Sequence, residues 1–354
     1  MLSPVHILLL CAAVCQLFCT AVPSTATDRT APLVFASQPL SAPGGTLAAI
    51  LKRDRILRHE LAGMGLALQV VAVKKGGDAI NLMQSGAADI ATLGDMPMLE
   101  AAATMQLSIF ARSRLSSISL VGKKGTLAKD LKGKLIGYAP GANGHFALLK
   151  ILAGSGLHET DVKLAPMDVT EMGAALLQKK IDAFSAWEPT PEATIAANPN
   201  RFGVIGKQSS VSHVVILQST ASRHPELRFH LAAALVRAIN WIGHDRTSLL
   251  LATDWTLEDM RALTGTAAIL TREQMANIIT RELEALNHSP KIPQETAADN
   301  SSLAEELLFL KEHGKIPAAV TWDSIRVGFD FKAMEQVTKQ PKIYQLTRYD
   351  YESN

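Results

Sequence analysis

Four short segments carry most of the residues whose types and spacing could do chemistry. Residues 41–46, 94–97, 141–145 and 187–191 are rich in glycine or in side chains with a hydroxyl, amide or carboxylate group, and each lies between an expected strand and an expected helix. The start of a helix has unpaired N–H groups and a positive dipole end, which favour a bound anion. Ligands of open α/β sheets bind beyond the carboxyl ends of the strands. We therefore expect these segments to form one binding site for a small anion.

The candidate ligand-binding residues are the small, polar and aromatic residues of these segments: Ser41, Thr46, Gly94, Asp95, Asn143, Gly144, His145, Trp187 and Glu188. Most of them also fit a structural role. A polar residue at the start of a helix can cap its N–H groups instead of binding a ligand. Trp187 fits either the hydrophobic core or the wall beside an alkyl part of the ligand.

The two acidic candidates leave a choice of roles open. Asp95 and Glu188 stand just before helices, where a carboxylate commonly accepts from backbone N–H groups or interacts with the helix dipole. The alternative is that one or both hold an ammonium group of the ligand, as an aminosulfonate such as taurine requires.

The sequence shows no signature of a common enzyme class. It has no G-x-x-x-x-G-K-[ST], H-E-x-x-H, G-x-S-x-G or C-x-x-C motif, and its histidines lack metal-ligand spacing. With 35 Lys and Arg residues against 33 Asp and Glu residues, the net charge of +2 is too balanced for a surface that follows nucleic-acid phosphates. We therefore expect a protein that is not an enzyme, without cofactor, metal or nucleic-acid partner.

The elements that position these segments follow from the hydrophobic pattern. From residue 32 to 215, short apolar runs alternate with amphipathic stretches, which is typical of β-α units around a largely parallel sheet. We expect strands at 33–36, 67–73, 88–93, 117–121, 135–139, 162–167 and 181–187. We expect helices at 46–61, with Thr46 as N-cap, at 78–86, with Asp78 as N-cap, and at 96–103, 146–156, 171–180 and 191–197.

The second half of this region repeats the first at an offset of 93 residues. Asp89 corresponds to Asp182, and Asp95 to Glu188, each of the latter pair being followed within two residues by a proline. The shared order of helix, acid, strand, acid, proline and helix indicates two lobes of one design, unless β-α units have converged on it by chance. Asp89 and Asp182 are interpreted as turn residues.

Beyond residue 219 the pattern becomes helical. Residues 224–242 are apolar at helical spacing, and further helices are expected to open near Leu257, Arg272 and Ser302, the last ending at Gly314. We expect these helices to cover the sheet of the first lobe.

The N-terminal region has the features of an export signal. No charged residue precedes Asp28, all three cysteines lie within residues 11–19, and an apolar run is followed by small residues. We predict a signal peptide at residues 1–26, which would leave the mature chain without cysteine. A lipoprotein anchor and a buried N-terminal helix are the alternatives.

Three spaced motifs carry a resemblance to a known family. They are LMQSGAADIATLGDMPMLEAAA at 82–103, DLKGKLIGYAPGANGHFALLKILAGSGLHETDVKLAPM at 130–167 and ALLQKKIDAFSAWEPTPEA at 175–193. Together with FLKEHGKIP and FDFKAMEQV near the C-terminus, they resemble the nitrate/sulfonate/taurine solute-binding proteins of ATP-driven (ABC) importers.

This resemblance implies a two-lobed, type II periplasmic binding-protein fold. Two doubly wound α/β lobes would be joined by two crossover strands, near 117–121 and 211–217, and would bind one small ligand between them. We predict one lobe from residues 27–116 and 218–354 and a second from residues 117–217. The resemblance further implies a periplasmic protein, taken to be a monomer, that delivers its ligand to a permease in the inner membrane.

The ligand is expected to be a small oxyanion such as an aliphatic sulfonate, taurine or nitrate. The chain has GANGH at 141–145 where the family often has several serines, so Asn143 and His145 would replace hydroxyl contacts. A pyrimidine or amine ligand, and a module that signals to a membrane sensor, are the alternatives. An enzyme on the same fold is disfavoured because the related pyrimidine-precursor synthases carry a cysteine-rich motif that is missing after Cys19.

Overall fold

A computed structural model describes residues 30–352, which form eight strands and fourteen α-helices. The predicted signal peptide lies outside these residues. The strands are β1 Ala31–Ser37, β2 Leu66–Ala72, β3 Ile90–Gly94, β4 Leu107–Lys123, β5 Leu135–Tyr138, β6 Lys163–Pro166, β7 Ala183–Ala186 and β8 Phe202–Leu217. The helices are α1 Gly44–Leu51, α2 Arg55–Gly63, α3 Gly76–Gln84, α4 Asp95–Ala102, α5 Asn143–Gly154, α6 Val169–Leu177, α7 Thr190–Ala197, α8 Gln218–Arg223, α9 Leu227–Ile242, α10 Arg246–Thr264, α11 Arg272–Ala285, α12 Ser302–Glu312, α13 Trp322–Arg326 and α14 Phe331–Lys339.

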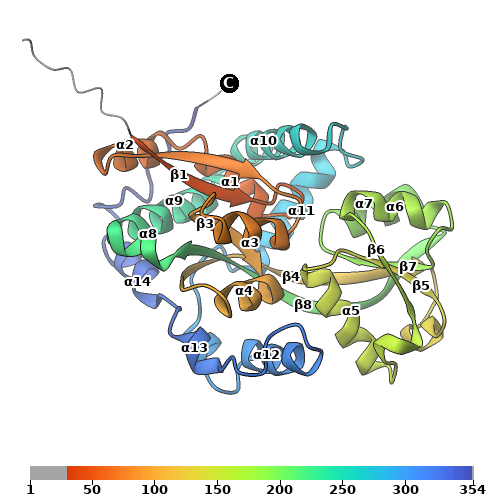
Figure 1. Ribbon diagram of the computed structural model, residues 1–354. Coiled ribbons are helices and arrows are strands. Elements are labelled where there is room, and N and C mark those ends of the chain that lie inside the picture. The colour runs from red at the N-terminus through yellow and green to blue at the C-terminus, as the bar shows by residue number, and fades with distance from the viewer. Residues whose placement is uncertain (1–29, 353–354) are drawn as a thin grey trace, which may run out of the picture.

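The strands form one continuous sheet in the order β2-β1-β3-β8-β4-β7-β5-β6. β1 pairs in parallel with β2 and β3, and β5 pairs in parallel with β6 and β7. The long strands β4 and β8 pair antiparallel with each other and connect the two halves. Figure 1 shows the two α/β bodies, with β5, β6 and β7 in one and β1 and β3 in the other, and with β4 and β8 running between them. The predicted two-lobed architecture with two crossover strands is confirmed.

Asp89 and Asp182 occupy equivalent places in the two lobes. The Asp89 carboxylate accepts from the backbone N–H of Val34 at 3.0 Å, and the Asp182 carboxylate accepts from that of Leu135 at 2.9 Å. Each acid therefore binds the backbone of the strand that lies in the middle of its lobe's parallel trio, at the first residue of β5 and in the middle of β1. The internal repeat seen in the sequence corresponds to a repeated structural contact.

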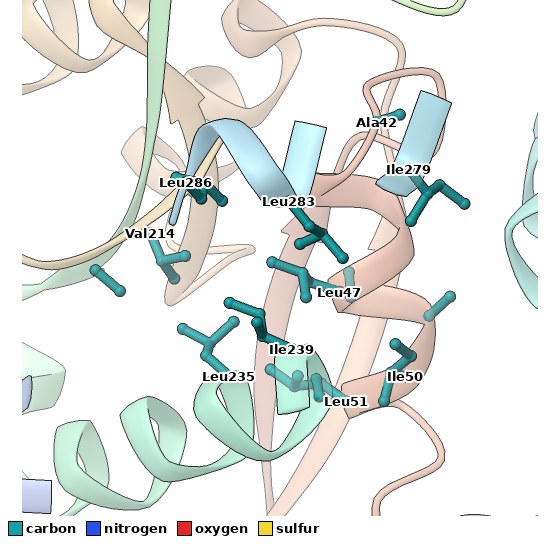
Figure 2. Close-up of a cluster of buried hydrophobic side chains, with 14 of the residues drawn as sticks. Ala42, Leu47, Ile50, Leu51, Val214, Leu235, Ile239, Ile279, Leu283 and Leu286 are labelled. Atoms are coloured by element: carbon teal, nitrogen blue, oxygen red, sulfur yellow. The ribbon is translucent and has the colours of Figure 1, made fainter. Parts of the chain in front are cut away.

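The C-terminal helices enclose the core of the larger lobe. Side chains of α1, α9 and α11 point toward one another in Figure 2 and are almost fully buried, among them Leu47, Ile50, Leu235, Ile239, Ile279 and Leu283. Burying a leucine or isoleucine side chain contributes about 1.5–3 kcal/mol. This packing fixes α1, and with it the loop that leads from β1 toward the interlobe space.

Several predicted element boundaries are wrong. The helix expected at 46–61 is two helices, and α1 begins at Gly44 after Pro43, so Thr46 is not its N-cap. Lys75, not Asp78, is the N-cap position of α3. Leu257 lies within α10 and does not open a helix.

The break between α1 and α2 has a cause distant in the sequence. Asp54 caps α2 by accepting from the N–H of Leu57 at 2.9 Å, and it is held by a buried ion pair with Arg237 of α9 at 2.7 Å. A buried acid needs such a partner. The partner lies 183 residues away in the sequence, so the local sequence pattern does not predict this break.

Candidate functional site

A small cavity lies in the interlobe space, at the carboxyl ends of strands from both lobes. Its lining residues are Gln38, Ser41, Gly76, Gly94, Pro97, Arg114, Ala142, Asn143, Trp187 and Ser212. We call it the central cavity. Three helices begin at its wall: Gly76 is the first residue of α3, Gly94 is the N-cap position of α4, and Ala142 is that of α5. Their N–H groups and dipoles favour a bound anion.

Arg114 supplies a permanent positive charge at this cavity. The residue lies in crossover strand β4 and is only 2% exposed. Its Nη2 donates to the carbonyl of Ser117 at 3.4 Å, whereas its Nε has no hydrogen-bond partner among the described residues. Burial lowers the pKa of Arg114, but an arginine keeps its charge in a protein. A buried guanidinium with a free N–H is well suited to an oxyanion.

Asn143 brings the second lobe to the same place. It is the first residue of α5, its Nδ2 donates to the Ser210 hydroxyl at 2.5 Å, and its buried Oδ1 has no partner within residues 30–352. Across the space lies Gly94, where an added Cβ would be 2.2 Å from the Asn143 amide. Only glycine at position 94 permits this approach. The loops at 94–97 and 141–145 therefore face each other, as the binding hypothesis requires.

Trp187 closes one side of the central cavity. It is buried, and its indole Nε1 donates to the carbonyl of Leu40 at 2.9 Å, which joins the second lobe to the loop after β1. Ser41 follows in this loop and also lines the cavity. Gln38, at the start of the loop, is fixed by a 2.6 Å bond from its Nε2 to the carbonyl of Thr92.

The side chains around the central cavity leave little free space. Its volume is about 20 Å³, which is enough for one ordered water. A second cavity of about 390 Å³, here called the mouth cavity, shares Trp187 with it and is lined by Lys74, Lys75, Asp78, Asp168 and neighbouring residues. A ligand of several heavy atoms must therefore enter with some movement of the lobes.

The two acidic candidates are engaged elsewhere. Both carboxylate oxygens of Asp95 accept from the N–H of Val211 in β8, at 2.8 and 3.1 Å. Glu188 accepts from the N–H of Glu192 in the first turn of α7, at 3.1 Å. Neither residue lines the central cavity. This geometry favours the structural alternative for both over contact with a ligand ammonium.

Burial shifts the pKa of both acids upward. It raises the pKa of Asp95 to about 7, against the opposing effect of the Val211 N–H and of Arg114, and it also raises the pKa of Glu188. The nearby buried Glu306 of α12 adds repulsion, and its own pKa is raised by burial and by Asp95. The carboxyl groups of Asp95, Glu188 and Glu306 near the central cavity therefore ionise less readily than exposed ones.

Three further candidates lie outside the cavity lining. The Thr46 hydroxyl accepts from Thr256 of α10 at 3.0 Å, and Gly144 packs where a Cβ would be 2.7 Å from the carbonyl of Ser185. The His145 ring lies 4.4 Å from the ring of Tyr138, and burial lowers its pKa to about 4. The structure therefore brings together Ser41, Gly94, Asn143 and Trp187.

Arg114 is the main residue that sequence reasoning missed. The crossover strand was expected at 117–121, but β4 begins at Leu107. The usable signal was a pair of arginines, Arg112 and Arg114, in an otherwise apolar and serine-rich stretch. Register shifts occur in β4 between Ile109 and Ala111 and between Arg112 and Arg114, so a simple two-residue alternation does not assign their faces.

Two other searches were negative within residues 30–352. No cluster of His, Cys, Asp and Glu side chains there could hold a metal ion. No helix in the described part of the chain is long and apolar enough to cross a membrane.

Known proteins resemble this chain over different lengths. Residues 61–215 match the family model described as NMT1/THI5 like. An Escherichia coli (strain K12) protein named as an aliphatic sulfonates-binding protein is 25% identical over 126 residues, which make up 34% of this chain and 40% of that relative. The match thus spans well under two thirds of that relative's length.

Solved structures share the fold over most of the chain. The alkanesulfonate-binding protein SsuA from Xanthomonas axonopodis pv. citri, bound to MOPS, has a TM-score of 0.63 at 16% identity, covering 85% of this chain and 98% of that chain. The periplasmic nitrate-binding protein NrtA from Synechocystis PCC 6803 has a TM-score of 0.60 at 14% identity, covering 88% and 89%. The expected resemblance to sulfonate- and nitrate-binding proteins is confirmed.

Proposed function

We propose that this chain is the exported, periplasmic solute-binding protein of an ABC importer and that it captures a small oxyanion, preferably a sulfonate, between its two lobes. The observation that carries the proposal is the buried Arg114 guanidinium at a cavity where three helices begin. The sulfonate- and nitrate-binding relatives support the ligand class. No bond is made or broken; the protein binds one ligand as a monomer and passes it to a membrane permease.

The proposed mechanism is closure of the lobes around the anion. Arg114 would provide the charge, and the N–H groups at the starts of α3, α4 and α5 would provide hydrogen-bond donors. Hydrogen bonds to a charged group contribute about 1.5–3 kcal/mol each, and closure strengthens them by removing water. Asn143 and Trp187 reach across from the second lobe and would complete the wall.

A cationic amine fits this arrangement less well. Asp95 and Glu188, the two acids that would hold it, bind backbone N–H groups, and the charge that lines the central cavity is Arg114. A pyrimidine remains the second candidate ligand. The alternative to a role in import is a role in signalling to a membrane sensor. A permease and an ATPase encoded beside this chain would favour import over sensing.

Arg114→Gln tests the proposal. Methanesulfonate, taurine, nitrate, bicarbonate and a pyrimidine are screened by thermal shift and titration calorimetry. We expect a sulfonate to stabilise the wild-type chain, by about 2.7 kcal/mol at one hundred times Kd. Arg114→Gln should weaken its binding by about 10- to 100-fold, because a charge-assisted hydrogen bond is lost.

Arg112→Gln is the matched control for this variant. It removes the same charge two residues away on β4, from a half-buried side chain that does not line the central cavity. Its Kd should stay near the wild-type value. A wild-type chain that responds to a pyrimidine or an amine and to none of the oxyanions would contradict the proposal.

A further inference from the structure

Arg114 already faces a carboxylate of the protein itself. Its Nε lies 3.9 Å from Oε2 of Glu282 in α11, and both side chains are almost fully buried, at 2% and 5% exposed. This distance is too long for a hydrogen bond, and neither atom has a hydrogen-bond partner in the described structure. The pair is close enough to attract but leaves these two atoms without a hydrogen bond, although the Ser116 side chain hydrogen-bonds to the Glu282 carboxyl group and Nη2 of Arg114 donates to the Ser117 carbonyl.

Glu282 also connects the ligand site to a contact between the lobes. Its Oε1 lies 3.8 Å from Nε of Arg281, whose Nη1 lies 2.9 Å from Glu192 and whose Nη2 lies 4.0 Å from Glu188. Both of these acids come from the second lobe, at or just before α7. Glu282 and Arg281 line a cavity of about 490 Å³ between α7 and α11, separate from the central cavity.

The buried carboxyl groups around Arg114 oppose the binding of a further anion. Arg114 is attracted to three carboxyl groups, Glu282, Asp95 and Glu188. Burial raises the pKa of all three, to about 7 for Asp95. A further negative charge in this low-dielectric region would repel those already present. A carboxyl group must therefore move away or take up a proton when an anion binds.

Glu282 is the carboxyl group nearest to the guanidinium's free N–H. Asp95 is tied by two hydrogen bonds to Val211, and Glu188 by one to Glu192. Oε2 of Glu282 has no such bond to lose. We propose that Glu282 is the internal competitor of the ligand for Arg114, and that a bound oxyanion takes its place while a proton from solvent neutralises the displaced carboxyl group.

This inference rests on the proposed function and makes oxyanion binding depend on pH. The charged groups that face Glu282 are Arg114 of β4, Arg281 of α11 itself, Glu192 of α7 and Glu188 just before α7. Asp95 adds a second titrating group, which faces Glu306 of α12 and, through it, Lys150 of α5. As the pH falls, a larger share of Glu282 is protonated and no longer competes, so the affinity for an oxyanion should rise.

Titration calorimetry with methanesulfonate tests the proposal, because that anion has no titrating group of its own. Repeating the titration in buffers of different ionisation enthalpy gives the number of protons bound with the ligand. For the wild-type chain we expect net proton uptake, and a Kd that rises with pH by at most about tenfold per unit for each coupled proton. Zero proton uptake with unchanged Kd between about pH 5 and about pH 9 would overturn the proposal.

Glu282→Gln provides a second test of the proposal, because glutamine keeps the shape of the side chain and removes its charge. We expect methanesulfonate to bind about tenfold more tightly to this variant near pH 8, with less proton uptake. An unchanged or weaker affinity in a folded variant would overturn the competition. If the variant does not fold, as circular dichroism would show, a lack of proton uptake by the wild-type chain still overturns the proposal.

Glu100→Gln is the matched control. Burial also raises the pKa of Glu100 to about 7, but the charged group that faces it is Lys315 and not Arg114. Its affinity and proton uptake should match the wild type. Failure of every probe oxyanion to bind the wild-type chain would contradict the proposed function, whereas binding without proton uptake would contradict the role of Glu282 alone.

Discussion

At the scale of single residues, the Trp187 indole forms a hydrogen bond that connects the two lobes. Its N–H donates to the carbonyl of Leu40 at 2.9 Å in a buried place. Trp187→Phe keeps an aromatic ring and leaves that carbonyl without its donor, which costs about 1–3 kcal/mol in the closed form. We expect about tenfold weaker binding of methanesulfonate by calorimetry.

Trp322→Phe is the control for this residue. Trp322 donates its indole N–H to the carbonyl of Ala297 at 3.3 Å, within the larger lobe. Removing it should lower the melting temperature without changing the Kd. Equal Kd values for Trp187→Phe and the wild type would show that the indole bond does not contribute to closure.

The residues of the site differ in how far they could be predicted. Ser41, Gly94, Asn143 and Trp187 could be named as candidates because they lie between a strand and a helix, beyond the carboxyl ends of strands, where ligands of open α/β sheets bind. Arg114 was not, because a charge in a crossover strand is recognised only once its burial is known. The carboxylates of Asp95 and Glu188 could either contact a ligand or accept from backbone N–H groups near a helix start. Only the hydrogen bonds seen in the structure distinguish these two roles.

At the scale of elements, the start of α5 depends on close contact with β7. An added Cβ at Gly144 would be 2.7 Å from the carbonyl of Ser185, whereas one at Gly154, in the same helix, would meet nothing within 4 Å. Gly144→Ala should push the start of α5 away from the central cavity. We expect a loss of about 1–3 kcal/mol in the free energy of unfolding and weaker binding of methanesulfonate.

Gly154→Ala should leave the affinity unchanged and stabilise the chain by up to about 1 kcal/mol. Denaturant unfolding measures both variants, and calorimetry measures their affinities. If Gly144→Ala bound methanesulfonate as tightly as Gly154→Ala does, the position of the α5 start would not matter for the ligand.

The β-α alternation gave the order of elements in both lobes, because parallel strands and their helices have simple apolar patterns. The boundaries that failed depend on distant contacts. The break before α2 is held by Arg237 of α9, and the length of β4 is set by its pairing with β8. Such contacts join residues that lie far apart in the sequence, so the local hydrophobic pattern does not reveal them.

At the scale of the whole molecule, contacts on different sides of the interlobe space hold the lobes together. Trp187 bonds to Leu40, Arg281 pairs with Glu192, and Lys74 reaches Asp168 at 2.9 Å beside the mouth cavity. The Lys74 pair, like the Arg281–Glu192 pair, is exposed to solvent. Its contribution must therefore be modest and sensitive to salt.

Lys74→Met removes this pair while Asp168 continues to cap α6. The closed form should lose one contact that opening must break, so the dissociation rate of methanesulfonate should rise by roughly two- to fivefold at low salt. The difference from the wild type should shrink as salt is added, because an exposed ion pair is screened. Stopped-flow dissociation at two salt concentrations measures both effects.

Lys132→Met is the matched control for closure. Lys132 pairs with Asp161 at 3.1 Å, on the surface of the second lobe alone. This pair does not span the interlobe space, so its loss should leave the dissociation rate unchanged. If both lysine variants released methanesulfonate at the same rate, the Lys74–Asp168 pair would not act as a latch, and ligand retention would rest on Trp187 and on the Arg281 contacts.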